Sequence, residues 1–334
     1  MVFRSLIRIF ADDMKYETLW HRLTGIYDTD EAKAIVRWML DVRFGLSLTD
    51  IVCGKIDEMS ETEQSELEAM MQRLEKAEPV QYVVGTAEFC GRRFHVEPGV
   101  LIPRPETGEL CEWIVASDQH GLTRTIDSAA EKAVRESPRL SDANILDVGT
   151  GSGCIAITLA LEMPQAKVTA WDISEKALSI AKKNAEALGA EVTFEKRDAL
   201  NHGDRHSDLR CATIIEPVPM IHPVPMIQQW DAIVSNPPYV CQKEAATMER
   251  HVLEHEPHLA LFVPDDDPLR FYRAIAKYGQ KTLKPNGLLY FEVNPLYASE
   301  TESMVRELGY AETEIKLDMF GKQRFLKAFN KGNN

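Results

Sequence analysis

The stretch that decides the fold of this 334-residue chain is Ile145-Leu146-Asp147-Val148-Gly149-Thr150-Gly151-Ser152-Gly153. Its first four residues are typical of a short buried strand, and the three glycines predict a tight turn. Cys154 to Leu161 has the pattern of an apolar helix, and Lys167 to Trp171 that of a second strand, which ends in Asp172. A strand, a glycine-rich turn, a helix, a strand and an acidic residue in this order predict a nucleotide-binding α/β unit.

Helix and strand patterns continue to alternate on the carboxyl side of this unit. Apolar periodicity predicts helices at residues 175–188, 269–283 and 297–308, and strands at residues 192–195, 231–235 and 287–292. Residues 313–317 and 324–329 then form a closing antiparallel hairpin. Five strands that alternate with helices and end in a hairpin predict a Rossmann-like, doubly wound α/β sheet.

The chain before this sheet has a helical pattern up to about residue 79. Apolar residues recur there at helical spacing, so we expect residues 1–79 to form a small helical bundle with a core of its own. Residues 80–105 are interpreted as a hairpin-like connector, and residues 106–334 as the catalytic domain. The bundle carries no catalytic constellation, so by analogy with other two-domain enzymes we expect it to dock the substrate.

Several segments are expected to be irregular. Residues 98–107 are rich in proline, residues 117–142 are polar and of mixed charge, and residues 201–229 repeat Val-Pro-Met-Ile. Proline removes backbone donors and interrupts helices, which favours extended chain in the first and third of these segments. We interpret residues 117–142 and 201–229 as insertions on the surface, and residues 254–261 as a further loop.

The composition excludes several classes of protein. Acidic residues outnumber basic ones by 52 to 38, and no basic run offsets the net charge of -14, so stable nucleic-acid binding is not expected. Six cysteines are scattered without a Cys-x-x-Cys pair, which argues against a metal site or a disulfide framework and favours a reducing cytoplasm. Arg8 interrupts the apolar start of the chain, and no apolar run could span a bilayer, so neither a signal peptide nor a membrane segment is expected.

The strand at residues 231–235 leads into Asn236-Pro237-Pro238-Tyr239, which predicts a rigid turn at the carboxyl edge of the sheet, where open parallel sheets bind ligands. Prolines lack a backbone donor, so the turn presents acceptors: the side-chain carbonyl of Asn236 and the backbone carbonyl of Pro237, with the ring of Tyr239 beside them. Two acceptors suit an NH2 group, and they favour a pyramidal nitrogen whose lone pair points at an electrophile. The alternative is an ordinary surface turn, because Asn-Pro and Pro-Pro are common loop dipeptides.

The glycine-rich turn carries the cofactor prediction. Its pattern, Gly149-x-Gly151-x-Gly153, differs from the Gly-x-Gly-x-x-Gly fingerprint of dinucleotide folds, which favours a nucleoside without a pyrophosphate. S-adenosylmethionine fits, because its positive sulfonium suits an acidic pocket. Asp172 follows the turn by about 20 residues, the spacing at which a carboxylate binds ribose hydroxyls, and Asp198 would lie near the adenine. Asp147 has two interpretations: a contact to the cofactor, or a cap of the turn beneath it.

Four motifs together resemble the PrmC/HemK family. They are Asp147 to Gly153, Ser235 to Tyr239, Ile102-Pro103-Arg104-Pro105-Glu106-Thr107 and Glu256-Pro257-His258-Leu259-Ala260-Leu261. Members of that family are S-adenosylmethionine-dependent methyltransferases that modify the glutamine amide of the Gly-Gly-Gln loop in class-one peptide chain release factors. The resemblance covers nearly the whole chain. One departure is that Gly108 and then Glu109 follow Pro-Glu-Thr, where the family usually has an acidic residue directly.

The resemblance implies a role for each motif. The cofactor would be S-adenosylmethionine, bound by Gly149, Thr150, Gly151, Ser152, Gly153, Asp172, Asp198, Ala199 and Asn236. The glutamine would be bound by Asn236, Pro237, Pro238, Tyr239, Arg104 and Glu106, of which Asn236, Pro237 and Tyr239 would be catalytic. Arg104 and Glu106 have the alternative of pairing only with each other. The partners would be class-one release factors, and we expect a cytoplasmic monomer without a metal ion, a membrane or nucleic acid.

Three other functions share parts of this pattern. A methyltransferase for a ribosomal-protein glutamine has the same core motifs and would differ in the N-terminal domain. A DNA adenine methyltransferase also uses Asn-Pro-Pro-Tyr on the exocyclic amine of a flipped base, but the acidic charge counts against it. An inactive adaptor would need only the cofactor motif, whereas this chain carries the target motif as well.

Overall fold

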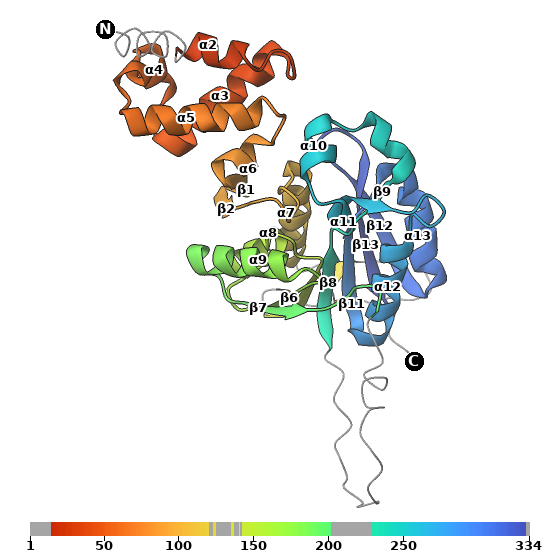
Figure 1. Ribbon diagram of the computed structural model, residues 1–334. Coiled ribbons are helices and arrows are strands. Elements are labelled where there is room, and N and C mark those ends of the chain that lie inside the picture. Colours follow the sequence, from red (N-terminus) through yellow and green to blue (C-terminus); the bar gives the residue numbers. More distant parts are fainter. Residues whose placement is uncertain are drawn as a thin grey trace, which may run out of the picture. The chain divides into compact units, whose positions relative to one another are not determined.

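The computed structural model describes residues 15–119, 123–124, 135–136, 140, 142–201 and 229–331 (Figure 1). Within these ranges the chain divides into two compact units. The first unit takes in the described residues up to Ala87, together with Val96–Pro98 and Thr247–Glu256. The second takes in Glu88–His95, the described residues between Gly99 and Ala246, and those from Pro257 onward.

The first unit is built from helices. Those that contribute to its hydrophobic core are α2 (Tyr16–His21), α3 (Thr29–Phe44), α4 (Leu48–Val52), the 3-10 helix η1 (Lys55–Glu58), α5 (Glu61–Leu74) and α6 (Val80–Val84). The unit also includes α10 (Arg250–His255), which has no buried residue. Asp28 caps α3 by accepting hydrogen bonds from Asp30 N and Glu31 N, and Ser60 forms a capping box with Glu63 at the start of α5. Leu19, Val36 and Leu67 from three of these helices are fully buried in the common core. The predicted helical bundle is confirmed.

The second unit contains a seven-stranded sheet. Its strands are β5 (Asn144–Val148), β6 (Lys167–Asp172), β7 (Val192–Lys196), β8 (Trp230–Ser235), β11 (Leu283–Glu292), β12 (Tyr310–Leu317) and β13 (Gln323–Asn330). The order across the sheet is β12-β13-β11-β8-β5-β6-β7, and β13 runs antiparallel to both of its neighbours, β12 and β11, whereas the other neighbouring pairs are parallel. The predicted doubly wound sheet is confirmed. The closing hairpin extends it at one edge, because β13 pairs with β11.

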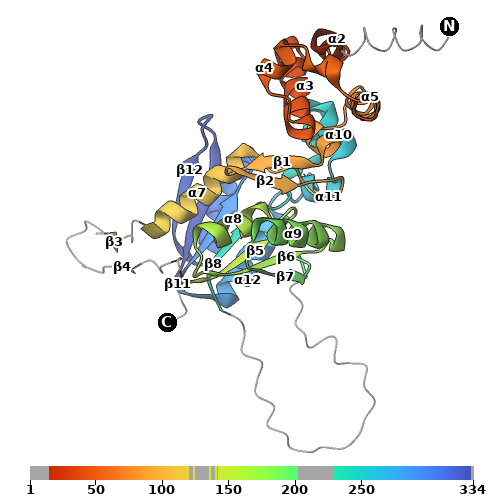
Figure 2. The ribbon, with the colours of Figure 1, turned by 90° about the vertical axis from the view of Figure 1, so that its left-hand side faces the viewer.

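Helices cover both faces of this sheet. One face carries α7 (Pro105–Gln119), α8 (Cys154–Glu162) and α9 (Glu175–Leu188), and the other carries α12 (Arg270–Thr282) and α13 (Ala298–Glu307) (Figure 2). Successive residues of a strand point to opposite faces. In β11, Leu288 and Tyr290 therefore join one core, whereas Leu289 and Phe291 join the other. The carboxyl ends of the parallel strands meet at one edge of the sheet, where the predicted motifs lie.

The connector differs in part from its prediction. Val80–Val84 is the short helix α6, where a hairpin strand was expected, and Gly85 closes it with a positive φ of 80°. The hairpin itself is limited to β1 (Thr86–Phe89) and β2 (Arg92–His95). Val80 and Val84 pack against the core of the helical unit, so tertiary packing overrides the extended preference of valine.

Two predicted loops also contain helix. Pro105 begins α7, because a proline at the first helical position lacks only an N–H that would have no helical partner. The predicted loop at residues 254–261 holds the end of α10 and the one-turn helix α11 (His258–Leu261), with Pro257 between them. In the second unit, β9 (Val240–Cys241) pairs in parallel with β10 (Phe262–Val263). Two 3-10 helices also occur, η2 (Gln242–Thr247) and η3 (Pro295–Tyr297).

Both predicted insertions lie mostly outside the described residues. In the segment 117–142, the last turn of α7 and the paired β3 (Thr123–Arg124) and β4 (Arg135–Glu136) are described. In the segment 201–229, only the two end residues are described. No helix of the described chain is long and apolar enough to cross a membrane.

Candidate active site

The glycine-rich turn after β5 uses its backbone donors within the protein. Gly149 N and Thr150 N both donate to the carbonyl of Trp171, at 2.8 and 2.9 Å. Gly151 N donates to Oδ2 of Asp172 at 2.9 Å, and Gly153 N donates to the carbonyl of Thr150 at 2.8 Å. A phosphate-binding loop needs such N–H groups free to face its ligand. The turn therefore suits a nucleoside without a pyrophosphate, as its glycine pattern predicts.

The three glycines of this turn differ in what surrounds them. All have positive φ, of 79°, 56° and 84° for Gly149, Gly151 and Gly153. A Cβ atom on Gly149 or Gly151 would meet no heavy atom of the described residues within 4 Å, so the turn borders open space there that a cofactor could fill. A Cβ atom on Gly153 would lie 2.8 Å from Cδ1 of Ile157 and 3.1 Å from Cβ of Ala181. Gly153 thus allows α8 and α9 to pack closely, whereas the first two glycines fit an approaching ligand.

Asp172 is held in a fixed orientation at the end of β6. Its Oδ2 accepts from Gly151 N and its Oδ1 accepts from Ser174 N, at 2.9 and 2.8 Å. An ionised carboxylate has about four acceptor positions, so capacity remains for ribose hydroxyls. Burial raises the pKa of Asp172, and the two backbone donors oppose this effect. The carboxylate is therefore oriented before any cofactor binds.

Asp198 and Asp147 have local structural partners. Asp198 accepts from Leu200 N at 2.8 Å and from Nδ2 of Asn201 at 2.7 Å, and the adjacent Ala199 packs against the core. Asp147 is fully buried and accepts a 2.6 Å hydrogen bond from Oγ1 of Thr150. Burial raises its pKa to about 7, and the Thr150 bond opposes this. This geometry supports the interpretation of Asp147 as a cap of the turn.

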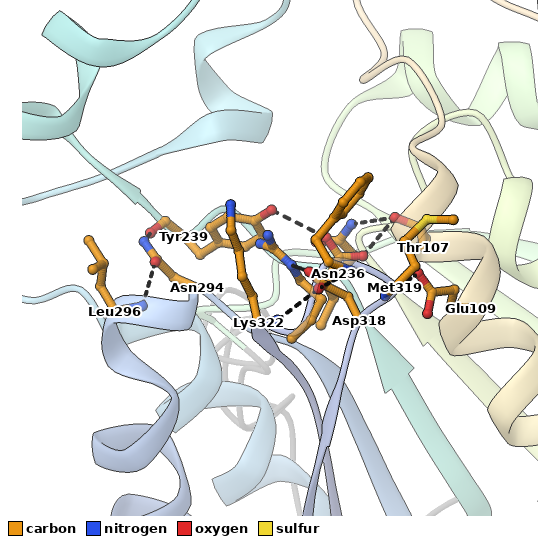
Figure 3. Close-up of polar contacts among 12 residues, drawn as sticks. Thr107, Glu109, Asn236, Tyr239, Asn294, Leu296, Asp318, Met319 and Lys322 are labelled. Carbon is orange, nitrogen blue, oxygen red and sulfur yellow. Dashed lines mark hydrogen bonds and ion pairs between the residues drawn. The ribbon is translucent and has the colours of Figure 1, made fainter.

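Asn236 follows β8 and belongs to a chain of side-chain hydrogen bonds. Its Nδ2 donates to Oγ1 of Thr107 at 3.0 Å, and Thr107 donates to Oε2 of Glu292 at 2.7 Å. The Tyr239 hydroxyl donates to the other oxygen of Glu292 at 3.2 Å (Figure 3). With its NH2 group engaged by Thr107, Asn236 keeps its side-chain oxygen for a ligand. The structure thus joins the Asn-Pro-Pro-Tyr turn to the start of α7 and the end of β11.

Charged groups surround this chain of hydrogen bonds. The positive charge of Arg324, on β13, lowers the pKa of both Glu292 and Tyr239. Asp318 holds Arg324 in place, with its Oδ2 3.2 Å from Nε of Arg324. Burial raises the pKa of Tyr239 well above its usual value, and the charge of Glu292 adds to this while those of Arg324 and Arg104 oppose it. Arg104 therefore lies within electrostatic reach of the predicted substrate site.

Glu106 lies on the same side of the site. It stands in the first turn of α7, and its charge raises the pKa of Glu292, which burial raises most. The described part of the chain contains no cluster of three or more residues suited to hold a metal ion.

Sequence reasoning missed three residues of this region. Thr107 lies in the Pro-Glu-Thr motif, but that motif drew attention to its charged residues instead. Glu292 ends the fifth strand at the ligand-binding edge of the sheet, a position that could have identified it. Asn184 of α9 is buried and donates both to the carbonyl of His95 and to that of Ser152, so it supports the glycine turn from below. A single buried asparagine in a helix pattern gives no sequence signal of this kind.

Comparisons with known proteins agree with this geometry. Residues 140–253 match a family described as a methyltransferase domain, and residues 20–85 match the PrmC N-terminal domain. A release factor glutamine methyltransferase of Bacteroides thetaiotaomicron is 45% identical over 92% of this chain and 95% of its own length. A protein of the same name from Flavobacterium psychrophilum is 35% identical over 91% and 94% of the two chains. One from Streptococcus pneumoniae is 33% identical over 84% and 86%.

The fold and the site thus define an α/β methyltransferase. The identities over nearly the whole chain are specific enough to go further, and the chain belongs to the release factor glutamine methyltransferase family. The resemblance to PrmC/HemK proteins, the predicted fold class and the predicted methyl transfer are confirmed.

Proposed function

We propose that this protein transfers the methyl group of S-adenosylmethionine to the side-chain nitrogen of the glutamine in the Gly-Gly-Gln motif of class-one release factors. The observation that carries the proposal is the orientation of Asn236. Its NH2 group is bound by Thr107, so its oxygen is left to accept from an amide N–H. The names of the relatives support the choice of substrate.

The Asn-Pro-Pro-Tyr turn would supply the chemistry through position. An amide nitrogen is a poor nucleophile, because its lone pair is delocalised into the carbonyl group. The oxygens of Asn236 and Pro237 would accept the two N–H bonds and favour a pyramidal nitrogen with its lone pair directed at the methyl carbon. Tyr239 would pack beside the substrate amide, fixed by its hydrogen bond to Glu292. As the nitrogen forms its bond to the methyl carbon, the bond from that carbon to sulfur would break, and the nitrogen would lose one N–H proton to solvent. The turn would act by fixing one geometry for this exchange.

The cofactor site would be formed by the turn Gly149–Gly153 and the two aspartates beyond it. When bound, S-adenosylmethionine supplies an electrophilic methyl group on a positively charged sulfur. Asp172 would bind the ribose hydroxyls through its remaining acceptor capacity, and Asp198 with Ala199 would border the adenine. Gly149 and Gly151 leave room for the ligand beside the turn. Arg104 and Glu106 would contact the chain of the substrate that flanks the glutamine.

The N-terminal helices would dock the release factor. We assign residues 1–79 to docking, 80–105 to the connector and 106–334 to the catalytic domain, with the match to the PrmC N-terminal domain as support. A cytoplasmic location is supported by five free cysteines in the described chain, as a reducing compartment maintains them. We propose a monomer that does not bind nucleic acid stably, in keeping with the net charge of -14.

The proposal is tested by offering labelled S-adenosylmethionine with three substrates: a class-one release factor, ribosomal proteins and DNA. We expect label only in the release factor, and none after its Gly-Gly-Gln motif is changed to Gly-Gly-Ala. Label in a ribosomal protein or in DNA instead would replace the proposed substrate. Bound cofactor with no labelled product would favour the inactive adaptor.

A further inference from the structure

We propose that Thr107 and Glu292 are positioning residues that set the hydrogen-bond polarity of the methyl-acceptor site. They orient the side-chain amide of Asn236 with its oxygen toward the substrate, and in this way select a carboxamide against a carboxylate. This inference rests on the proposed function, because it concerns the choice between glutamine and glutamate at the same site.

The direction of each hydrogen bond follows from counting hydrogens. An ionised carboxylate has none, so Glu292 can only accept, at Oε1 from the Tyr239 hydroxyl and at Oε2 from the Thr107 hydroxyl. Thr107 has a single hydroxyl hydrogen, and it donates that hydrogen to Glu292 in a hydrogen bond. Toward Asn236, 3.0 Å away, the Thr107 oxygen can therefore only accept. The group of Asn236 that faces Thr107 must be its NH2 group.

Burial makes this direction costly to reverse. Thr107 is 3% exposed and Glu292 is 2% exposed, so water does not compete for their hydrogen bonds. If the amide of Asn236 turned over, its oxygen would face the lone pairs of Thr107, and neither oxygen would find a donor. The chain of bonds spans 185 residues of sequence between Thr107 and Glu292, on α7 and β11, which are both rigid elements of the sheet unit.

Burial raises the pKa of Glu292 above its usual value, and Glu106 on α7 acts in the same direction. The Thr107 hydrogen bond, the positive charge of Arg324 on β13 and the Tyr239 hydrogen bond oppose this rise and favour the ionised carboxylate. From α12, the Tyr272 hydroxyl donates to the backbone carbonyl of Glu292 at 3.2 Å, outside the carboxylate network.

The consequence is a site that presents acceptors to its substrate. A glutamine side chain brings an NH2 group, which matches the oxygens of Asn236 and Pro237. A glutamate side chain brings only acceptors, so it would meet oxygen against oxygen. A site built around one hydrogen-bond pattern rejects an analogue that lacks it more strongly than a site based on shape alone. Without Thr107 as an acceptor, Asn236 could turn over and present its NH2 group to a carboxylate.

The test uses Thr107→Val, which keeps the shape of the side chain and removes the hydroxyl, beside Thr107→Ser, which keeps the hydroxyl. The valine variant should lose turnover on the release factor by roughly 10- to 100-fold, as for other residues that orient a functional group. Its affinity for S-adenosylmethionine, measured by calorimetry, should stay near the wild-type value. A release factor with Gly-Gly-Glu in place of Gly-Gly-Gln should inhibit the valine variant more strongly than the wild type. The serine variant should keep most of the wild-type turnover, and the Gly-Gly-Glu release factor should inhibit it only as weakly as it inhibits the wild type.

Two further variants keep the outcome clear. Thr158→Val makes the same change at a threonine of α8 that is 2% exposed and whose hydroxyl has no hydrogen-bond partner among the described residues, so its turnover should match the wild type. Glu292→Met offers no strong acceptor to Thr107 and thereby releases the Thr107 hydrogen toward Asn236, so it should lose turnover and gain inhibition as Thr107→Val does. If Thr107→Val does not bind cofactor, Glu292→Met tests the inference in its place.

The inference is overturned if the folded valine variant turns over like the wild type, if Thr107→Ser loses as much turnover as Thr107→Val, or if inhibition by the glutamate form does not change. These failures differ from a failure of the proposed function, in which the wild-type protein itself would not label the release factor.

Discussion

At the scale of single residues, Asn236 has the most specific role. Asn236→Ala removes the acceptor for the substrate N–H, so turnover on the release factor should fall by about 10²–10³-fold, as for loss of one preorganised hydrogen-bonding group. Cofactor affinity should change far less. Asn236→Asp keeps an acceptor oxygen but replaces the NH2 group that donates to Thr107, so its turnover should be lower than that of the wild type. Single-turnover kinetics measure the change in turnover, and calorimetry measures the change in cofactor affinity. If the alanine variant turns over at nearly the wild-type rate, the Asn-Pro-Pro-Tyr motif has no catalytic role and is only a stiff turn.

Asp147 gives a prediction for stability against pH. Burial raises its pKa to about 7 in the folded protein, from a usual value of 3.8, so the folded state binds this proton more tightly than the unfolded state. The protonated carboxyl of Asp147 adds to the free energy of unfolding in full below the unfolded pKa, and this contribution is lost as pH rises through about 7. Asp147→Asn keeps an oxygen for Thr150 and cannot ionise. The variant should therefore gain stability relative to the wild type as pH rises, by at most about 1.4 kcal/mol per pH unit. Urea unfolding at several pH values measures this, and a difference that is constant with pH would contradict it.

At the scale of elements, two glycines of one turn should respond differently to the same change. Gly153→Ala places a methyl group 2.8 Å from Ile157 and 3.1 Å from Ala181, so it strains the packing of α8 on α9 as well as the backbone. We expect a loss of about 2–4 kcal/mol in unfolding free energy. Gly149→Ala meets no neighbour, so its cost should be only the backbone term of roughly 1–2 kcal/mol. Cofactor affinity should instead fall more in Gly149→Ala. Equal stability losses would show that the turn itself, and not helix packing, requires Gly153.

Local pattern predicted most elements of the sheet unit, and long-range contacts set the rest. β5, α8 and β6 follow from apolar runs and glycines that are neighbours in sequence, and their predicted limits differ from the structure by one residue at most. The wrong predictions were α6, α11, the first turn of α7 and the end of α10, short stretches of helix that were expected to be extended or irregular. Thr107 and Glu292 meet only because α7 lies beside the carboxyl edge of the sheet. No local pattern states such a contact, so the orientation of Asn236 could be seen only in the structure.

At the scale of the whole molecule, the division into two units leads to a prediction about docking. The sheet unit has two hydrophobic cores of its own, on either side of the sheet, and the helical unit has a third. Deletion of residues 1–79 should therefore leave cofactor binding intact and abolish methylation of the intact release factor. The segment Thr247–Glu256 complicates the deletion, because it packs with the helical unit, where Nε2 of His255 lies 3.2 Å from the carbonyl of Lys76.

The control for this deletion is chosen to separate docking from damage to that segment. His255→Ala in the full-length chain removes the contact to Lys76 and keeps every docking helix, so it should still methylate the release factor. Calorimetry with S-adenosylmethionine should give similar affinities for the full chain, the His255 variant and the truncated chain. Docking by the helical unit then predicts that only the truncated chain fails on the intact release factor. Full turnover by the truncated chain would show that the sheet unit alone recognises its protein substrate. Loss of turnover in the His255 variant as well would place the defect in the segment that follows the Asn-Pro-Pro-Tyr turn.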